Sequence, residues 1–202
     1  MSSPENITVR NRGRLPHWEV EGGVYFVTFR LADSLPQKAL QQTRFTRRDI
    51  PATAAQMGRE TSESERKRLK KLHAQRIERF LDAGAGECQL YNQLINYVVI
   101  DSLKKFDGER YRLFAWCLMP NHVHVVFQPF QGHAIAALLQ AWKSFSGKHA
   151  NRILRREGAF WQREYYDHLI RNEEEFTHAV RYTLENLSKA GLANWSWVGP
   201  CL

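Results

Sequence analysis

Residues 111–127 read YRLFAWCLMPNHVHVVF, and this stretch decides the fold. It contains two runs rich in β-branched and aromatic residues, at 111–118 and 122–128, each with the length and composition of a strand. Only the three residues 119–121 separate the two runs. A link this short joins antiparallel strands, so we expect a hairpin, or two neighbouring strands of one antiparallel sheet.

An earlier run predicts another strand of the same core. Residues 24–31 follow two glycines and are rich in β-branched and aromatic residues. The side chains expected to share its buried face are Tyr25, Val27, Phe29 and Leu31. Residues 1–19 are polar and are expected to be irregular.

Apolar residues at helical spacing predict helices over 88–107 and 133–155. The residues expected on their buried faces are Tyr91, Leu94, Ile95, Val98, Val99, Leu103 and Phe106 in the first and Ile135, Leu138, Leu139, Trp142 and Phe145 in the second. A short strand is expected to start at 160–161, and a last helix to begin near Asn172 and stop at Gly191. This order predicts an α+β domain, with helices packed on one face of an antiparallel sheet of about four to five strands.

Basic residues concentrate in one part of the chain. Between Lys38 and Arg79 there are 12 Lys or Arg against 5 Asp or Glu, which accounts for most of the net charge of +8. We interpret residues 1–202 as a single domain in which 35–85 is a basic helical insertion after the first core strand and 193–202 is a C-terminal tail. The insertion could contact a phosphate backbone or could be an ordinary solvated helical face.

Composition narrows the class of protein. The chain has 202 residues, and 43% of them are hydrophobic, which suits a folded protein. Its net charge of +8 suits a polyanionic partner, although a role in solubility would also explain the charge. The three cysteines are far apart and form no CxxC, so we expect reduced thiols in a cytoplasmic protein. No signal peptide or apolar run of membrane-spanning length is expected.

Two groups of polar residues could carry chemistry. His122 and His124 alternate with apolar residues, so both imidazoles should leave the strand on one face, with their Cα atoms about 6.5–7 Å apart, where they could bind one metal ion. They could equally be two histidines on the polar side of a half-buried strand. His178, Tyr182 and Asn186 follow at i, i+4 and i+8 on one face of the last helix, although a helical tyrosine is more often a core residue.

Several other chemistries are excluded by their missing motifs. The sequence has no phosphate-binding GxxxxGK[ST] loop, no HExxH and no GxSxG. A dinucleotide-binding fingerprint is also missing, and the single ExxH at 175–178 does not make a carboxylate di-iron site.

Three ordered stretches resemble one family. Residues 117–124, CLMPNHVH, are similar to the HUH motif of the IS200/IS605-like single-tyrosine (Y1) transposases. Residues 160–171, FWQREYYDHLIR, and 182–192, YTLENLSKAGL, resemble the branch of REP-associated tyrosine transposases (RAYT). The resemblance runs over 22–31 and again over about 90–192, and it implies a ferredoxin/RRM-like HUH core.

The resemblance implies a transposase and single-strand DNA endonuclease with strand-joining activity. Tyr182 matches the nucleophile, which attacks a DNA phosphate to form a 5′-phosphotyrosine and releases a 3′-hydroxyl. His122, His124 and Asn186 match the ligands of a divalent metal, Mg²⁺ or Mn²⁺ by resemblance, although histidines alone would suit zinc equally. His178, one turn before Tyr182, is a possible accessory residue.

The expected partner is single-stranded or hairpin DNA, in particular REP-like palindromes. The residues expected to contact DNA are Arg66, Lys67, Lys70, Lys71, Lys143, Lys148, Arg152, Arg163 and Arg171. The protein is expected to be a cytoplasmic, nucleoid-associated monomer or homodimer without a membrane partner, and Tyr182 could meet the histidines of its own or of a sister subunit.

Two alternatives remain open at this point. The chain could be a domesticated protein that binds hairpin DNA without strand transfer. It could also be a replication initiator or relaxase of the wider HUH group, in which the tyrosine commonly precedes the histidines or is well separated from them. Here Tyr182 follows His124 by 58 positions, which favours the transposase branch.

Overall fold

The computed structural model of the chain describes residues 7–12, 15–35, 62, 64, 81, 83–192 and 195–200. The chain divides into two compact units, one formed by residues 1–32 with 89–202 and the other by residues 33–88. Most of the predicted basic helical insertion, residues 35–85, lies outside the described residues, so the fold below is that of the first unit.

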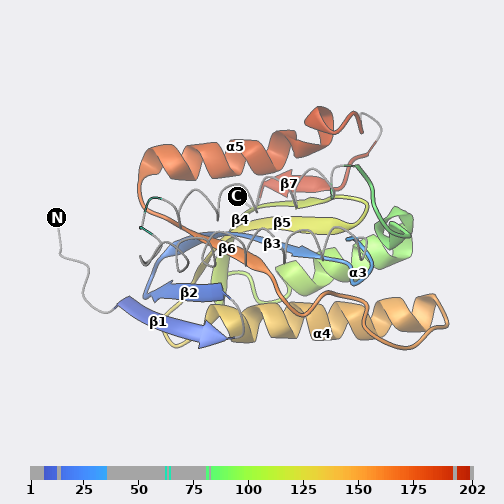
Figure 1. The fold of residues 1–202 in the computed structure, drawn as a ribbon, viewed down its shortest axis with the longest axis horizontal. Coiled ribbons are helices and arrows are strands. Elements are labelled where there is room, and N and C mark those ends of the chain that lie inside the picture. Colours follow the sequence, from blue (N-terminus) through green and yellow to red (C-terminus); the bar gives the residue numbers. More distant parts are fainter. Residues whose placement is uncertain are drawn as a thin grey trace, which may run out of the picture. The chain divides into compact units, whose positions relative to one another are not determined.

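Seven strands and several helices make up this unit (Figure 1). In chain order, the elements are β1 (Ile7–Arg12), β2 (Leu15–Val20), β3 (Val24–Arg30), η1 (Gln89–Tyr91), α3 (Gln93–Lys104), β4 (Tyr111–Leu118), β5 (His122–Pro129), α4 (Ile135–Ile153), β6 (Tyr166–Ile170), α5 (Glu173–Lys189) and β7 (Val198–Pro200).

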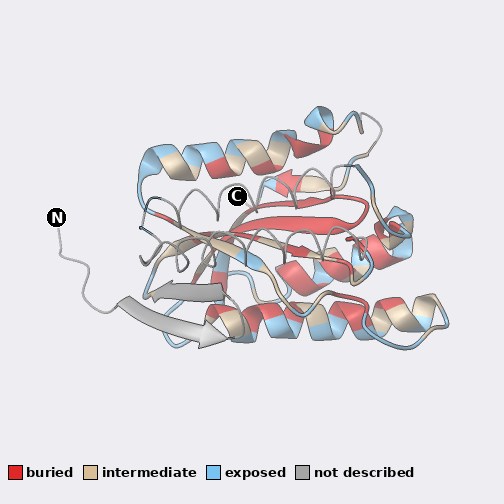
Figure 2. Cartoon of the chain, in the orientation of Figure 1, coloured by how far each residue is buried: buried red, intermediate tan, exposed pale blue. Residues whose placement is uncertain are grey.

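Five strands form the central sheet, in the order β6-β3-β5-β4-β7. Every neighbouring pair is antiparallel, which confirms the predicted α+β fold and the hairpin of β4 and β5. β5 lies in the middle of the sheet and is buried along almost its whole length, as Figure 2 shows. β1 and β2 form a separate two-stranded hairpin.

The two faces of the sheet are covered by different helices. α3 and α4 pack on one face, in a core that includes Val123, Val125 and Phe127 of β5. On the other face, Phe176, Val180 and Leu184 of α5 pack against β3, β4 and β5. In Figure 1, α5 lies on one side of the sheet and α4 on the other. The prediction that the helices share one face is therefore wrong, because alternation shows which residues share a face without showing what covers it.

Two predictions about local structure are wrong. Residues 7–12 and 15–20, expected to be irregular, are paired strands, because polar residues can form a ladder through their backbone groups. The short strand expected at 160–161 starts only at Tyr166, and Trp161 makes a single isolated bridge with Leu31.

Three residues expected in the core are exposed. Tyr91 and Leu94 are 57% and 62% exposed, because the α-helix begins only after the N-cap Asn92, whose side chain accepts the Leu94 N–H and leaves Tyr91 in a separate 3-10 turn. Phe145 is 40% exposed on α4, where it lies beside His149 instead of facing the core. The other predicted core positions that the structure buries include Ile95, Val99, Leu103, Leu138, Leu139 and Trp142.

Cys88 and Cys117 are free, buried thiols, and Cys201 lies outside the described residues. Among the helices that the structure describes, none has both the length and the apolar character needed to cross a membrane.

Candidate active site

The two histidines of β5 lie together on the α5 face of the sheet. His122 is 0% and His124 is 3% exposed, so both are buried, not half-buried at a solvated face. Strand alternation sends Val123, Val125 and Phe127 into the opposite core and leaves the imidazoles on the face that α5 covers.

Each imidazole has its Nδ1 held by a neighbour and its Nε2 directed at the other imidazole. His122 Nδ1 is 2.7 Å from Oδ1 of Asn121, and His124 Nδ1 is 2.8 Å from Oγ1 of Thr28. The two Nε2 atoms converge at 3.0 Å. Asn121 Oδ1 can only accept, so His122 donates through Nδ1 and its Nε2 has a lone pair. The outer hydrogen bonds therefore fix both rings with their inner nitrogens directed at one point.

The surroundings keep both imidazoles neutral. Burial lowers the pKa of His124 to about 3. Burial also lowers the pKa of His122 well below its ordinary value, and the neighbouring His124 and the positive charge of Arg30 lower it further. Two neutral, oriented imidazoles form a nitrogen donor pair of the kind that binds a divalent transition metal.

Tyr182 of α5 lies against this pair in the same chain. Its ring centroid is 5.6 Å from that of His124, in an edge-to-face arrangement, and 5.8 Å from that of Phe26. Lys189 Nζ is 5.4 Å from the Tyr182 ring centroid, and the exposed His178 stacks at 6.4 Å. The predicted meeting of phenol and imidazoles on one face is thus realised within a single chain.

Local sequence explains why α5 holds Tyr182 there. The N-cap Asn172 accepts the Glu175 N–H at 2.8 Å, as a capping residue should, and Glu175 Oε2 accepts the N–H of Arg171, the residue before the N-cap, at 2.9 Å. Gly191 ends the helix with a φ of 71°, which a glycine adopts without strain. The predicted start and stop of this helix are therefore confirmed, and its apolar face presses Tyr182 toward the sheet.

Asn186 lies one helical turn beyond Tyr182 and is buried, at 4% exposed. The next residue, Leu187, packs with Cys117 and Met119, and Cys117 pairs with His124 across the sheet. The second half of α5 therefore lies over the histidine end of β5. Two imidazole nitrogens and one amide oxygen suit a divalent cation with open positions. The described residues contain no group of three His, Cys, Asp or Glu that could hold a metal, so such a site would depend on the amide.

Three residues of this site were missed by the sequence analysis. Thr28 and Arg30 of β3 pair in register with His124 and His122, which places them on the same face of the sheet. Asn121 directly precedes His122 in the stretch 117–124, so a hydrogen bond between its side-chain oxygen and His122 could have been predicted. Thr28 and Arg30 had no such signal, because the register between β3 and β5 is a long-range property.

The structure distributes the predicted DNA-contacting residues over separate places. Lys148 and Arg152 are exposed on α4, on the face opposite the histidines, and Arg163 and Arg171 are exposed beside β6. Lys143 is partly buried, and its Nζ donates to the Arg163 carbonyl at 2.8 Å. Four others lie outside the described residues, and these are Arg66, Lys67, Lys70 and Lys71.

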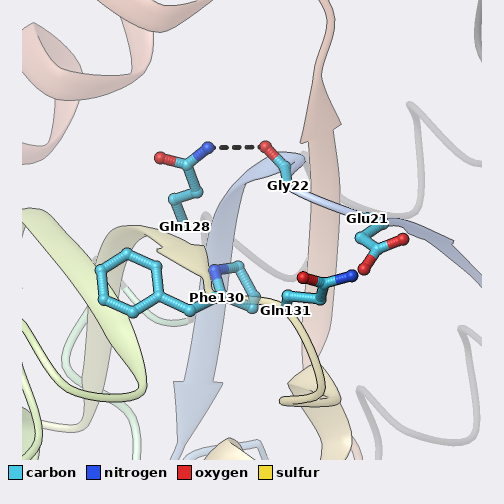
Figure 3. Close-up of a pocket in the computed structure, with 6 residues that line it drawn as sticks. Glu21, Gly22, Gln128, Phe130 and Gln131 are labelled. Carbon is cyan, nitrogen blue, oxygen red and sulfur yellow. Dashed lines mark hydrogen bonds between the residues drawn. The ribbon is translucent and has the colours of Figure 1, made fainter.

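A hollow of about 470 Å³ opens at the other end of β5 (Figure 3). It is lined by Glu21, Gly22 and residues 128–131, and Gln128 Nε2 donates to the Gly22 carbonyl at 2.7 Å. Glu21 is its one titratable lining residue. The hollow therefore lacks the paired chemistry of the histidine site, which is the stronger candidate.

Residues 93–185 match the family model "Transposase IS200 like". His122, His124 and Tyr182 lie inside the matched range, and Asn186 is one residue beyond it. The family resemblance seen in the sequence is confirmed over these residues.

One solved structure is similar to this chain in fold. A REP-associated tyrosine transposase bound to a REP hairpin is similar to this chain with a TM-score of 0.50 and 16% identity, over 93% of this chain and 82% of that chain. A second comparison is with the crystal structure of a protein from Deinococcus radiodurans R1 that is described as a candidate transposase. Its TM-score is 0.33 and its identity 12%, over 88% of this chain and 97% of that chain. No curated protein matches the chain.

Proposed function

We propose, from the premise that residues 93–185 are those of an IS200-like transposase, that this protein cuts and rejoins single-stranded DNA with Tyr182 as nucleophile. The observation that carries the proposal is the contact of Tyr182 with His124, whose Nε2 converges with that of His122 at 3.0 Å. A nucleophile and a donor pair for a metal thus share one buried face. REP-like hairpins are the proposed substrate class, because the structurally similar transposase is bound to one.

The reaction exchanges one phosphodiester for another. Tyr182 Oη forms a bond to phosphorus, the bond from phosphorus to the 3′-oxygen breaks, and the phenol proton is lost while the 3′-oxygen gains one. The products are a 5′-phosphotyrosine and a free 3′-hydroxyl. Attack of a 3′-hydroxyl on the phosphotyrosine reverses these changes and rejoins a strand, so the cycle needs no nucleotide cofactor.

His122, His124 and Asn186 are the residues that would hold a divalent ion, with Mg²⁺ or Mn²⁺ as our expectation. Such an ion would neutralise charge on the scissile phosphate and make its phosphorus more electrophilic. The donor set fits this role, because the two imidazoles are neutral and oriented and the amide lies one helical turn from the nucleophile.

The chain's own groups position the nucleophile. Phe26 and His124 contact the Tyr182 ring on the sheet side and limit where its hydroxyl can go. One rigid helix carries both Tyr182 and Asn186, so their spacing is fixed before DNA binds. Lys189 Nζ lies 5.4 Å from the centroid of the phenol ring and forms an ion pair with Glu185 at 3.2 Å; a phosphate bound at the site would compete with Glu185 for this positive charge.

The geometry supports a site completed within one subunit, so we propose that a monomer is sufficient for cleavage. Residues 35–85 remain a proposed basic insertion that contacts the phosphate backbone, whereas the segment 193–202, expected to be a tail, contributes β7 to the edge of the sheet. Because DNA is the proposed substrate, we expect the protein at the nucleoid.

The test is incubation of the full chain with Mn²⁺ and a labelled library of DNA hairpins with randomised single-stranded feet. The wild type should form a covalent protein–DNA adduct that survives denaturation, and Tyr182→Phe should form none. Tyr97→Phe is the matched control, since Tyr97 is 57% exposed on α3 and should leave the adduct unchanged. Hairpin binding without any wild-type adduct would instead support a domesticated DNA-binding protein.

A further inference from the structure

A cluster of three charged residues lies beside the histidine pair, at the edge of the sheet. Arg30 is the last residue of β3 and stands opposite His122, so its side chain leaves on the same face. β6 pairs with β3 only as far as Thr28, and residues 160–162 run beside the rest of that edge, with the Gln162 N–H donating to the Arg30 carbonyl at 2.9 Å. Glu164 follows Gln162 by two residues, and its charge acts on Arg30.

Lys143 of α4 reaches the same edge from the other side. Its Nζ donates to the Arg163 carbonyl at 2.8 Å and lies 5.9 Å from the Tyr165 ring centroid. Arg30, Lys143 and Glu164 are all partly buried. The charges of Arg30 and Glu164 both act on Lys143, in opposite directions.

The positive charge in this cluster exceeds the negative charge. Among the described residues that act on them electrostatically, Arg30 and Lys143 share Glu164 as their one carboxylate. Arg30 and Lys143 are both partly buried, so holding two positive charges there has a cost that an anion would reduce. A guanidinium offers a planar fork for two phosphate oxygens, and an ammonium adds a compact charge.

We propose that Arg30 and Lys143 form an anion subsite that takes a backbone phosphate of the DNA strand next to the phosphate held at His122 and His124. Glu164 is the counter-ion that this phosphate displaces. The inference rests on the proposed function, because it takes the histidine face to be where DNA lies. Arg30 and His122 stand directly opposite each other on β3 and β5, about 5 Å apart between Cα atoms. This spacing suits two neighbouring phosphates of one DNA strand.

The experiment measures binding of fluorescent (dT)₁₂ by anisotropy over a NaCl series in EDTA, so that neither cleavage nor a metal contributes. Arg30→Gln and Lys143→Gln should each weaken binding about tenfold at low salt and reduce the salt slope by about 0.7, the value for one phosphate contact on a single strand. Arg30→Lys, which keeps the charge without the fork, should fall between the wild type and Arg30→Gln. Glu164→Gln should tighten binding several-fold, because the competing carboxylate is gone.

Lys104→Gln is the matched control. Lys104 is an exposed residue at the end of α3. The preceding residue, Leu103, accepts a hydrogen bond from Tyr111, which pairs with Pro129 at the end of β5 opposite the histidines. Replacing Lys104 should therefore change DNA binding little. Thermal melting of each variant checks folding. If Arg30→Gln does not fold, the two single variants Arg30→Lys and Lys143→Gln test the subsite in its place.

Two results would overturn the subsite. Arg30 and Lys143 variants that bind (dT)₁₂ as Lys104→Gln does would show that no phosphate reaches them. A Glu164→Gln variant that loses thermal stability and binds more weakly would show an ordinary structural ion pair. Either outcome leaves adduct formation by the wild type untouched, whereas loss of the adduct with these binding effects intact would refute the proposed function alone.

Discussion

The two faces of β5 have different tasks, although their residues alternate along one strand. Toward α3 and α4, the strand contributes Val123, Val125 and Phe127 to an apolar core. Toward α5, it contributes His122 and His124, whose neighbours in the sheet are Thr28, Arg30 and Cys117. One face therefore stabilises the fold, while the other buries polar groups, and their burial lowers the free energy of unfolding.

The comparison explains how a reactive site can be precise. Close packing of the apolar face fixes the position of β5. The histidines are on the same strand, so their Cα atoms are fixed with it. On the α5 face, hydrogen bonds to Asn121 and Thr28 set the remaining freedom of each ring. Substitutions on the two faces should therefore separate stability from activity.

The largest effect is expected on the histidine face. His124→Ala removes one nitrogen donor and the ring that Tyr182 contacts, so adduct formation per folded molecule should fall at least about 1000-fold. The fold should persist, because the variant removes a buried polar group and leaves the opposite core intact. Adduct yield in Mn²⁺ together with a melting curve checks both; activity within tenfold of wild type would separate His124 from the chemistry.

The opposite result is expected on the apolar face. Phe127→Ala should lower the free energy of unfolding by about 3–5 kcal/mol, because it leaves a cavity beside Tyr111 and Trp142. Adduct formation per folded molecule should stay near wild type at a temperature where the variant is folded. Urea unfolding and single-turnover adduct assays measure the two quantities, and a large loss in the second would mean that the faces are not separable.

A smaller effect is expected for the hydrogen bond that orients His124. Thr28→Val keeps the volume but removes the hydroxyl at 2.8 Å from His124 Nδ1. We expect Mn²⁺ affinity, measured by calorimetry, to fall about 10- to 100-fold. Thr177→Val, on the exposed side of α5, is the matched control and should bind Mn²⁺ as the wild type does.

The smallest effect is a pH dependence of DNA binding. The folded-state pKa of Lys143 is lowered to about 8, so this residue is charged at pH 7 and largely neutral at pH 9. Glu164 and Arg30 are the charged groups that act on it. Affinity for (dT)₁₂ should therefore fall about tenfold from pH 7 to pH 9, since an anion favours the protonated form. Lys143→Gln should show a flat profile, and an equal slope in both proteins would assign the effect to another group.

The sequence predicted the parts of the fold that depend on local patterns. Alternation and a short link identified the hairpin of β4 and β5, and capping residues identified the two ends of α5. The same reasoning placed both histidines on one face and Tyr182 with Asn186 on one side of a helix. These are properties of segments shorter than about twenty residues, in which period and end signals are explicit.

The rest depended on contacts between distant segments. No local signal shows that α5 covers the face opposite α3, or that Thr28 stands beside His124, because both follow from strand order and register. β7 has only three residues and lies where a tail was expected. Lys143 was expected to be an ordinary DNA contact, and its partly buried place beside Arg30 depends on how α4 meets residues 161–164.

The central claim is that Tyr182 becomes covalently joined to DNA, and mass spectrometry of the trapped adduct tests it most directly. Trypsin cleaves after Arg181 and Lys189 and should release the peptide YTLENLSK, residues 182–189, with a nucleotide on its tyrosine. The account predicts this modified peptide in the wild type and its absence in His124→Ala. A nucleotide on any other residue, or DNA cleavage that leaves the 182–189 peptide unmodified, would contradict it.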